Sequence, residues 1–351
     1  MSDLRIEQHG SLGVITLNRP QSLNALTTDM CRGMLTALLR WRNDRSIRQV
    51  VVAGAGDRGL CAGGDIVAIY RDIQNREGST DEFWRIEYQL NALIDEYPKP
   101  YIALMDGIVL GGGIGISAHG SHRVVTERSK CGMPEVGIGF FPDVGGTHLL
   151  ARAPRAAGRY AALTGLGVGA ADAIHLGLAD VYVESSRLPA LRQALTEQPV
   201  DEVLPLFRGD APKGILTEPW ILAFDHGELE QIHRALRQSG DPDALKADEA
   251  LQRACPSAVH LVNRLIGGAG KNLRLDLVRE FRAAINRLDD PDFAEGIRAA
   301  VIDKDRSPQW VRSLPGLDPE RRTAAHFAPL PGGDLAFDLI AEFAADNEGA
   351  K

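Results

Sequence analysis

A run of three glycines between two apolar segments is the feature that most constrains this chain. Residues 101–110 read as a strand, Gly111, Gly112 and Gly113 follow, and residues 114–118 can continue as a helix. Glycine has no Cβ, so backbone N–H groups at such a junction can approach a ligand closely. They also carry the partial positive charge of a helix start. The junction predicts a site that stabilises an oxygen gaining negative charge, although a tight turn is the plainer interpretation of a triplet alone.

Two carboxylates follow the triplet in apolar surroundings. Glu135 comes directly after Pro134 and before a flexible glycine-containing segment, and Asp143 follows residues 140–142, Phe-Phe-Pro. Poor solvation favours the protonated form of a carboxyl group, so we expect the pKa values of both to be raised. A raised pKa suits proton transfer near neutral pH. For a glutamate after proline, an ordinary place in the first turn of a helix is the structural alternative.

A second glycine junction lies upstream of the first. Gly63 and Gly64 precede Asp65, a good N-cap for a helix that continues through Ile66. An oxyanion hole requires two N–H donors that converge on one oxygen. The amides of Gly64 and Gly112, from two separate loops, are our candidates for those donors.

Residues 54–59 formally match the GxGxxG fingerprint of a dinucleotide-binding fold, which is the main rival interpretation. In that fold the third glycine opens a helix that carries the pyrophosphate. Here residues 60–62 lead instead into Gly63 and Gly64, which would break such a helix. We therefore expect no nicotinamide cofactor.

The charge balance argues against nucleic acid as the main partner. The chain has 39 Lys and Arg against 47 Asp and Glu, a formal net charge of −8, whereas nucleic-acid binding relies on clustered cations. The most apolar stretch, residues 101–118, is interrupted by Asp106 and several glycines and is too short to span a membrane. The first ten residues lack the pattern of a secretory signal.

The cysteines are scattered and form no CxxC pair, which fits free thiols in a reducing compartment better than disulfides or a zinc site. We therefore expect a cytosolic protein without a bound metal. The four cysteines are Cys31, Cys61, Cys131 and Cys255.

Strand and helix signals alternate along the first half of the chain, which predicts an α/β architecture. From about residue 186 charged helical segments follow, without a convincing strand. We place a boundary near residues 190–200 and predict two units, residues 1–195 and residues 196–351.

In order along the chain stand Leu17–Pro20, Cys61–Ile66, the glycine triplet, Pro134-Glu135, Gly145-Gly146 and Gly177–Asp180. Together these motifs resemble the crotonase, or enoyl-CoA hydratase/isomerase, superfamily. Within it the chain is most similar to the 3-hydroxyisobutyryl-CoA hydrolases. The motifs of that narrower similarity are Glu87–Asn91, Ser117–Gly120, Met133–Glu135, Phe141–Gly146, Gly296–Ala299 and Ile302–Trp310.

The resemblance implies a crotonase-type core of repeated ββα turns that binds acyl-CoA, followed by a mainly helical C-terminal region. It implies that Gly64 and Gly112 hold a thioester carbonyl, that Glu135 and Asp143 are an acidic catalytic pair, and that Glu87 contacts the substrate. CoA belongs to the substrate, so no separate cofactor is implied. Related proteins commonly form trimers or pairs of trimers, which leaves a homo-oligomer open. The residues implied to line the acyl-CoA path are Ala25, Ala62, Asp65 and Ile66, with Lys304 as a candidate for a CoA phosphate.

Two departures from the hydratase pattern bear on the reaction. Hydratases of the superfamily carry a second glutamate three residues past the middle glycine of the triplet, where this chain has Gly115. Asp143 stands where hydratases usually carry glycine. We therefore expect hydrolysis of a short 3-hydroxyacyl-CoA thioester, such as 3-hydroxyisobutyryl-CoA in valine catabolism, with Glu135 acting as nucleophile or as general base.

Three alternatives stay open beside this prediction. An enoyl-CoA hydratase or isomerase with relocated acids would keep the fold. A non-catalytic acyl-CoA-binding scaffold would need no carboxylates, and here they are present. A thioesterase of the α/β-hydrolase type would need GxSxG, whereas residues 115–119 read GISAH.

Overall fold

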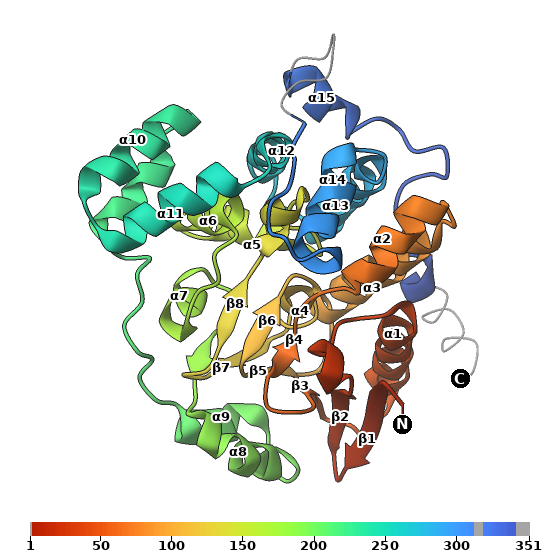
Figure 1. Cartoon of the computed structure of the whole chain (residues 1–351). Coiled ribbons are helices and arrows are strands. Elements are labelled where there is room, and N and C mark those ends of the chain that lie inside the picture. The colour runs from red at the N-terminus through yellow and green to blue at the C-terminus, as the bar shows by residue number, and fades with distance from the viewer. Residues whose placement is uncertain (1, 312–318, 342–351) are drawn as a thin grey trace.

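The computed structural model describes residues 2–311 and 319–341 (Figure 1). Its larger sheet has the strand order β1-β2-β3-β5-β7-β9, in which β1 and β2 form an antiparallel hairpin and the later neighbours are parallel. These strands are β1 (Leu4–His9), β2 (Leu12–Leu17), β3 (Gln49–Gly54), β5 (Tyr101–Met105), β7 (His122–Val125) and β9 (Val181–Tyr182).

A smaller parallel sheet runs β4-β6-β8, and each turn of the chain adds one strand to each sheet, β3 then β4, β5 then β6, β7 then β8. A helical segment follows each pair, so the expected ββα repeat is confirmed. The strands are β4 (Gly59–Cys61), β6 (Ile108–Leu110) and β8 (Lys130–Gly132), and the helices that follow them are α2 (Ile66–Asn75) and α3 (Ser79–Asp95), α4 (Gly112–Gly115) and the 3-10 helix η2 (Pro134–Ile138).

The single strand predicted for residues 101–110 is wrong, because the chain turns at Gly107 and divides the segment into β5 and β6. Gly107 has φ +68°, and a Cβ there would stand 2.6 Å from the carbonyl oxygen of Arg58. Only glycine fits such a turn, and it carries the chain from one sheet to the other. Residues 55–58 connect β3 to β4, and a strand follows them where the dinucleotide-binding fingerprint requires a helix.

The parallel strands β2, β3 and β5 of the larger sheet are buried on both faces, as parallel sheets usually are, whereas the edge strand β1 is mostly exposed. Ile15, Val52 and Met105 point into the main core, which includes the apolar faces of α1 (Thr28–Asn43) and α3. Their neighbours Val14, Val51 and Leu104 point to the other face. There they meet a smaller apolar cluster contributed by α8 (Leu188–Leu195) and α9 (Val200–Phe207).

Local signals set several helix ends. Thr27 accepts a hydrogen bond from the Met30 amide at the start of α1, and Asp65 accepts one from the Ala68 amide at the start of α2, so the predicted N-cap at Asp65 is confirmed. Pro154 separates two helices. These are α5 (Gly146–Arg152) and α6 (Arg155–Thr164).

Every described element after β9 is helical, in agreement with the composition of that region. Its side chains join the same main core as the first half, from Leu216 to Ile340, while the division into two units stays a prediction. In Figure 1, α13 and α14 lie beside α2 and α3, whereas α10 and α11 extend to the opposite side. The remaining helices are α7 (Ala170–His175), α10 (Leu229–Ser239), α11 (Pro242–Arg253), α12 (Pro256–Ile266), α13 (Leu273–Arg287), α14 (Pro291–Ile297), α15 (Pro319–Ala325), the 3-10 helices Pro20–Ser22, Ser185–Arg187 and Pro219–Asp225, and the π-helix Arg298–Ile302.

In the described parts of the chain, none of the helices has the length and apolar character needed to cross a membrane.

Candidate active site

The two glycine junctions meet at one cavity of about 140 Å³ between the smaller sheet and α3. Its apolar wall includes Phe83, Trp84, Phe140 and Phe293, with Trp84 and Phe293 each stacked on Phe140. Most of the residues singled out from the sequence line it. They are Ala62, Gly64, Ile66, Glu87, Gly112, Glu135 and Asp143.

A larger hollow of about 520 Å³ lies on the opposite face of the six-stranded sheet, where Leu12, Ala53 and Leu188 line it. The three glycines of the GxGxxG match, Gly54, Gly56 and Gly59, line it, but none of the residues expected to bind or hydrolyse an acyl-CoA does. Since the buried acids converge on the smaller cavity, we take the smaller cavity as the candidate active site.

The amides of Gly64 and Gly112 lie side by side in this cavity. A Cβ on Gly112 would stand 3.4 Å from the Gly64 nitrogen, so the two loops are in contact. Neither N–H donates a hydrogen bond to a described residue. Both are therefore available to an oxygen placed between them, as an oxyanion hole requires.

Two carboxylates lie so close to the triplet that a side chain on Gly111 or Gly112 would clash with them. A Cβ on Gly111 would be 2.6 Å from Glu135 Oε1, and a Cβ on Gly112 would be 2.6 Å from Glu87 Oε1. Any larger residue would displace an acid. The triplet thus brings backbone amides and carboxylates to the same small space.

Glu87 from α3, Glu135 from η2 and Asp143 from the loop before α5 are the buried acids of the cavity, with exposed fractions of 2%, 8% and 6%. Burial raises the pKa of Glu135 well above its usual range, and the charge of Asp143 adds to this. Burial does the same for Glu87, reinforced by Asp143 and Glu135. Burial raises the pKa of Asp143 to about 7. The expectation of raised pKa values is thus confirmed, and the three acids do not all ionise independently at neutral pH.

Tyr88 holds one of these acids in place. Its hydroxyl donates a 2.7 Å hydrogen bond to Asp143 Oδ2 and so opposes the rise in that pKa. By contrast, Glu87 Oε1 and Glu135 Oε2 are buried without a hydrogen-bond partner among residues 2–311 and 319–341. Buried polar atoms usually have a partner, so these two oxygens are acceptors left available in the cavity.

Gly115 is enclosed by neighbouring side chains. A Cβ there would stand 2.7 Å from the Cβ of Val144 and 2.9 Å from Asn91 Nδ2. No glutamate fits at this position without moving the loop that carries Asp143. The packing around Gly115 therefore leaves no room for the second glutamate that hydratases carry at this position.

Three of the residues expected along the acyl-CoA path do not line the cavity. Asp65 caps α2, forms a 3.2 Å ion pair with Arg19, and borders an adjacent cavity of about 110 Å³ that shares Ile69 and Phe83. The Ala25 carbonyl accepts a hydrogen bond from Arg19. Lys304 is exposed. Contact of these residues with CoA stays a prediction.

The turn that carries Lys304 is tied to the C-terminal helices. Lys304 has φ +58°, and Arg298 forms 2.6 Å ion pairs with Asp303 and Asp305 on either side of it. Asp303 and Asp305 therefore fix the turn through one guanidinium group.

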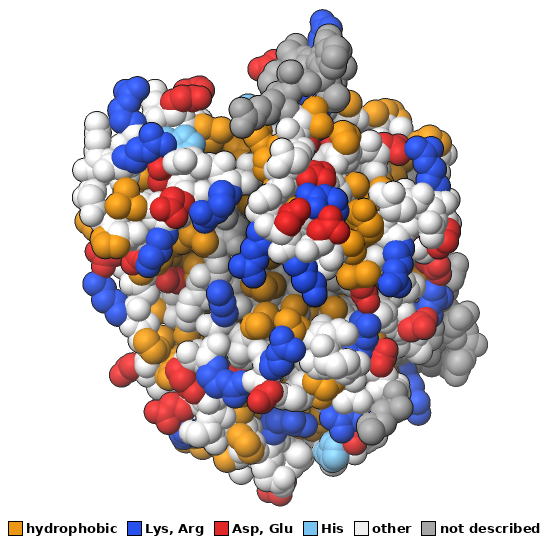
Figure 2. All heavy atoms as spheres, in the orientation of Figure 1, with side chains coloured by type: hydrophobic (Ala, Val, Ile, Leu, Met, Phe, Trp, Pro, Cys, Tyr) orange, Lys and Arg blue, Asp and Glu red, His pale blue; other side chains and the backbone are white. Residues whose placement is uncertain are grey.

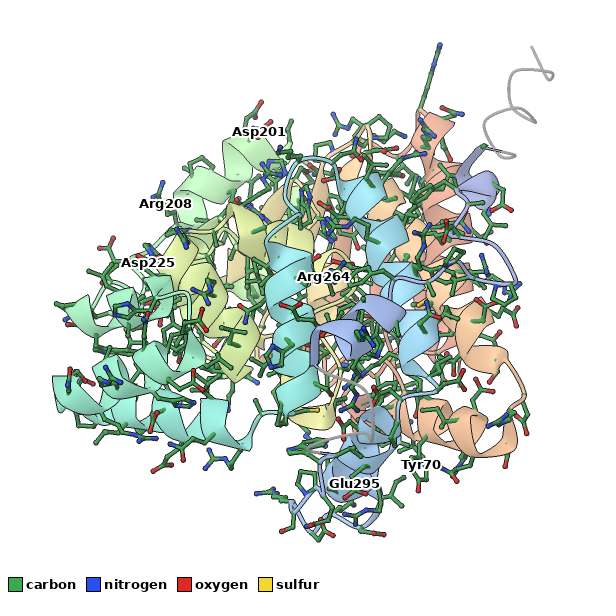
Figure 3. All side chains as sticks on the ribbon, turned by 90° about the horizontal axis from the view of Figure 1, so that it is seen from above. Tyr70, Asp201, Arg208, Asp225, Arg264 and Glu295 are labelled. Carbon is green, nitrogen blue, oxygen red and sulfur yellow. The ribbon has the colours of Figure 1, made fainter. Side chains whose placement is uncertain are left out.

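Helix α2 borders the cavity together with α14 of the C-terminal region. They pack against each other, and Phe293 of α14 reaches the cavity. In Figure 3, Tyr70 of α2 and Glu295 of α14 lie on the same side of the molecule. Figure 2 shows Lys and Arg side chains gathered around the middle of one face, despite the net negative charge of the chain. Such a surface favours an anionic ligand.

Sequence reasoning assigned no role to two residues that support the site, Tyr88 and Glu280. Glu280 is fully buried on α13 and hydrogen-bonds the turn after Asp143. Burial raises its pKa to about 8, although Thr147 and Gly145 donate to it. The available signal was a glutamate among the apolar positions Leu277, Phe281 and Ala284, where helical spacing buries it.

No group of three or more His, Cys, Asp or Glu side chains in the described residues is placed to hold a metal ion.

Comparison with known proteins matches the chain along almost its whole length. A family model described as enoyl-CoA hydratase/isomerase matches residues 12–325. A 3-hydroxyisobutyryl-CoA hydrolase, mitochondrial, of Mus musculus is 36% identical, covering 96% of this chain and 91% of the relative. The enzyme of the same name from Danio rerio is 38% identical, covering 95% and 91%.

Solved structures give the same fold under different names. A carnitinyl-CoA dehydratase from Mycobacterium thermoresistibile superposes with a TM-score of 0.91 at 40% identity, covering 96% of this chain and 99% of that one. An enoyl-CoA hydratase from Rhodobacter sphaeroides 2.4.1 gives a TM-score of 0.87 at 39% identity, covering 95% and 100%. The crotonase-type fold expected from the sequence is thereby confirmed.

Proposed function

The chain belongs to the enoyl-CoA hydratase/isomerase family, and from that premise we propose that it hydrolyses the thioester bond of a short 3-hydroxyacyl-CoA. The substrate we propose is 3-hydroxyisobutyryl-CoA, an intermediate of valine breakdown. The observation that carries the proposal is the packing at Gly115. Val144 and Asn91 occupy the space of a second glutamate, while a buried Asp143 lies in the same cavity as Glu135.

The chemistry begins with the polarised carbonyl. With the thioester oxygen between the amides of Gly64 and Gly112, two N–H groups stabilise the negative charge that develops when the carbonyl carbon is attacked. Removing one such donor typically lowers kcat by about 10²–10³-fold. The surrounding Phe83 and Trp84 exclude water, which strengthens these interactions.

Glu135 is the group that drives the attack, by one of two routes. As a general base, it takes a proton from a water that adds to the carbonyl. As a nucleophile, its carboxylate adds instead, and water then hydrolyses the mixed anhydride. In both routes the C–S bond breaks and CoA leaves as a thiolate that takes up a proton.

The other two acids suit a substrate with a hydroxyl group. Glu87 Oε1 lacks a partner in the described part of the chain and can accept a hydrogen bond from such a hydroxyl. Asp143, held by Tyr88, can orient the attacking water or the same hydroxyl. An acyl group without a hydroxyl would leave a buried acceptor unpaired, which typically costs about 1–3 kcal/mol.

A comparison of two substrates tests the proposal. The purified protein is given 3-hydroxyisobutyryl-CoA and crotonyl-CoA, and both free thiol and the absorbance of the conjugated double bond are followed. We expect thiol release from the hydroxyacyl thioester and an unchanged double bond in crotonyl-CoA. Loss of the double bond without thiol release would replace hydrolysis with hydration.

Hydration is the second candidate because the similar solved structures are described as a dehydratase and a hydratase. The presence of three acids in one cavity also leaves room for a different acid–base pair.

As for the compartment, the thiols of Cys31, Cys61, Cys131 and Cys255 are buried and free, which fits a reducing environment. The vertebrate relatives are named mitochondrial, and the cytosolic location expected from the sequence stays a prediction.

A further inference from the structure

Glu280 reaches from α13 to the turn that follows Asp143. Its Oε2 accepts a 2.7 Å hydrogen bond from the Gly145 amide, and its Oε1 accepts a 3.0 Å hydrogen bond from the Thr147 amide. The Thr147 hydroxyl donates to the same Oε1. One fully buried carboxylate from the C-terminal region thus gathers three donors from residues 145–147.

The turn needs such support because its backbone is strained. Val144 has φ +52°, a left-handed conformation that a β-branched residue rarely adopts. Conformations of this kind persist only where the surroundings enforce them. The Val144 carbonyl accepts a 2.8 Å hydrogen bond from His119 Nε2 on one side, and Glu280 holds the next amide, that of Gly145, on the other.

The next residue is equally confined. Gly145 has φ +79°, and a Cβ there would stand 2.6 Å from the His119 ring and 2.7 Å from Leu273 at the start of α13. The turn therefore packs between His119 on one side and α13 on the other. Its position depends on where α13 lies.

The same helix also supports the side chain of Asp143. Phe281, next to Glu280, packs edge-on against the Tyr88 ring at 6.1 Å between centroids and 82° between planes. Tyr88 in turn donates to Asp143. Two consecutive residues of α13 thus contact the backbone turn after Asp143 and the side chain that orients its carboxylate.

We propose that Glu280 is a positioning residue for the reaction, because it holds the strained turn at residues 143–147 and thereby fixes the Asp143 carboxylate relative to Glu135. This inference deepens the proposed hydrolysis and rests on it for its kinetic part. The geometric part, the hold of Glu280 on the turn, stands independently of which acyl-CoA is the substrate. Glu280 itself is no catalytic residue, since it does not line the cavity.

The test compares two substitutions of Glu280 with a matched control on the same helix. Glu280→Ala removes all three acceptor contacts, whereas Glu280→Gln keeps one acceptor oxygen and the side-chain volume. Asp276→Asn is the control, because Asp276 is also a buried acid of α13 but accepts from His148 and Gly270 rather than from residues 143–147. For each variant, kcat, KM, the melting temperature and amide hydrogen exchange of residues 143–147 are measured in the full-length protein.

We expect kcat of Glu280→Ala to fall by about 10²-fold with little change in KM, as for a displaced catalytic group. Glu280→Gln should recover part of the loss. Asp276→Asn should lower the melting temperature while kcat stays within about threefold of the unsubstituted protein, a change of less than about 0.7 kcal/mol in the barrier. Exchange of the Gly145 and Thr147 amides should accelerate in Glu280→Ala only.

The proposal is overturned if kcat of Glu280→Ala stays within threefold of the unsubstituted protein, or if exchange at residues 143–147 does not change. It is also overturned if Asp276→Asn lowers kcat as much as Glu280→Ala, because the effect would then be general destabilisation. Faster exchange in Glu280→Ala supports the hold on the turn even if the unsubstituted protein releases no thiol. That last result would overturn the proposed function alone.

Discussion

Two regions of the molecule bury acidic side chains, and they shift the pKa values of these acids in opposite directions. The site carboxylates, Glu87, Glu135 and Asp143, have no Arg or Lys ion pair among the described residues, and their pKa values are raised. The arginine network between α13, α14 and α15 consists of Arg287, Asp290, Asp292, Arg322 and His326. Within the network, burial favours the protonated Asp290, but His326 and the two guanidinium groups outweigh it and lower that pKa.

The comparison shows how one fold separates stability from chemistry. In the arginine network every carboxylate faces a cation within 3 Å, so its charge is stabilised in the folded chain. Among the described residues, the only side chain that hydrogen-bonds a site acid is the neutral Tyr88, so these acids keep their protons to higher pH and can exchange them with substrate near neutral pH. The network ties the C-terminal helices together, and the site uses the acids that the fold leaves unpaired.

Removing a site carboxylate should abolish activity without harming the fold. In Glu135→Gln the side-chain volume is kept but the base is lost, so kcat should fall by about 10²–10⁴-fold. The free energy of unfolding should stay the same or rise, because no ion pair is broken. Thiol release and urea denaturation of the same preparation measure the two effects, and Glu96→Gln, an exposed glutamate paired with Arg274, is the control. A folded Glu135→Gln protein with full activity would remove Glu135 from the mechanism.

Breaking the arginine network should instead destabilise the fold. Arg287 is fully buried and donates to Asp290 at 2.9 Å and to the Gly139 carbonyl at 2.7 Å, so Arg287→Met leaves the two buried carboxylates of the network with a single guanidinium group between them. We expect the free energy of unfolding to fall by about 3–5 kcal/mol. Lys213→Met breaks an exposed pair with Glu218 and should change it by less than about 1 kcal/mol. Equal losses in the two variants, measured by urea denaturation, would contradict the contrast between the regions.

The two regions should also respond to pH with opposite sign. The pKa of Glu87 is raised in the folded chain, so the unfolded chain releases that proton first and stability falls as pH rises above the ordinary glutamate value. The pKa of Asp290 is lowered, so its contribution is lost as pH falls below the ordinary aspartate value. Glu87→Gln cannot ionise and should gain roughly 0.5–2 kcal/mol over the unsubstituted protein at neutral pH.

The gain from Glu87→Gln should vanish near about pH 4, where the unfolded chain keeps the proton as well. Urea denaturation of both proteins at several pH values measures the difference. A gain that is constant across the whole pH range would mean that packing rather than ionisation causes it.

Much of the site could be predicted because its parts are local in sequence. Glycines at strand ends, an N-cap at Asp65 and acids in apolar segments are visible in short windows, and the structure brings Gly64, Gly112, Glu135 and Asp143 to one cavity. Glycine at position 115 was visible too, but its cause, the packing of Val144 against it, required the fold.

The remaining features depend on contacts between distant residues. Tyr88 reaches Asp143 across 55 positions, and Glu280 reaches Gly145 across 135. No short window contains such pairs, and a buried tyrosine on an amphipathic helix looks the same whether or not it meets an acid. The division of residues 101–110 into two strands was missed for the same reason, because Gly107 is forced to turn by backbone from Arg58.

The smallest effect is expected from substituting Tyr88, the neutral residue that hydrogen-bonds Asp143. Tyr88→Phe removes a hydrogen bond that lowers the pKa of Asp143, so that pKa should rise further from its value of about 7. The limb of the pH–rate profile that reports Asp143 should move to higher pH, and kcat at the optimum should fall by about fivefold, the equivalent of one hydrogen bond. Tyr97→Phe is the matched control, because it loses a buried hydrogen bond to the Leu38 carbonyl outside the cavity. A shift of the limb in both variants, or a shift to lower pH in Tyr88→Phe, would mean that Tyr88 does not set the protonation of Asp143.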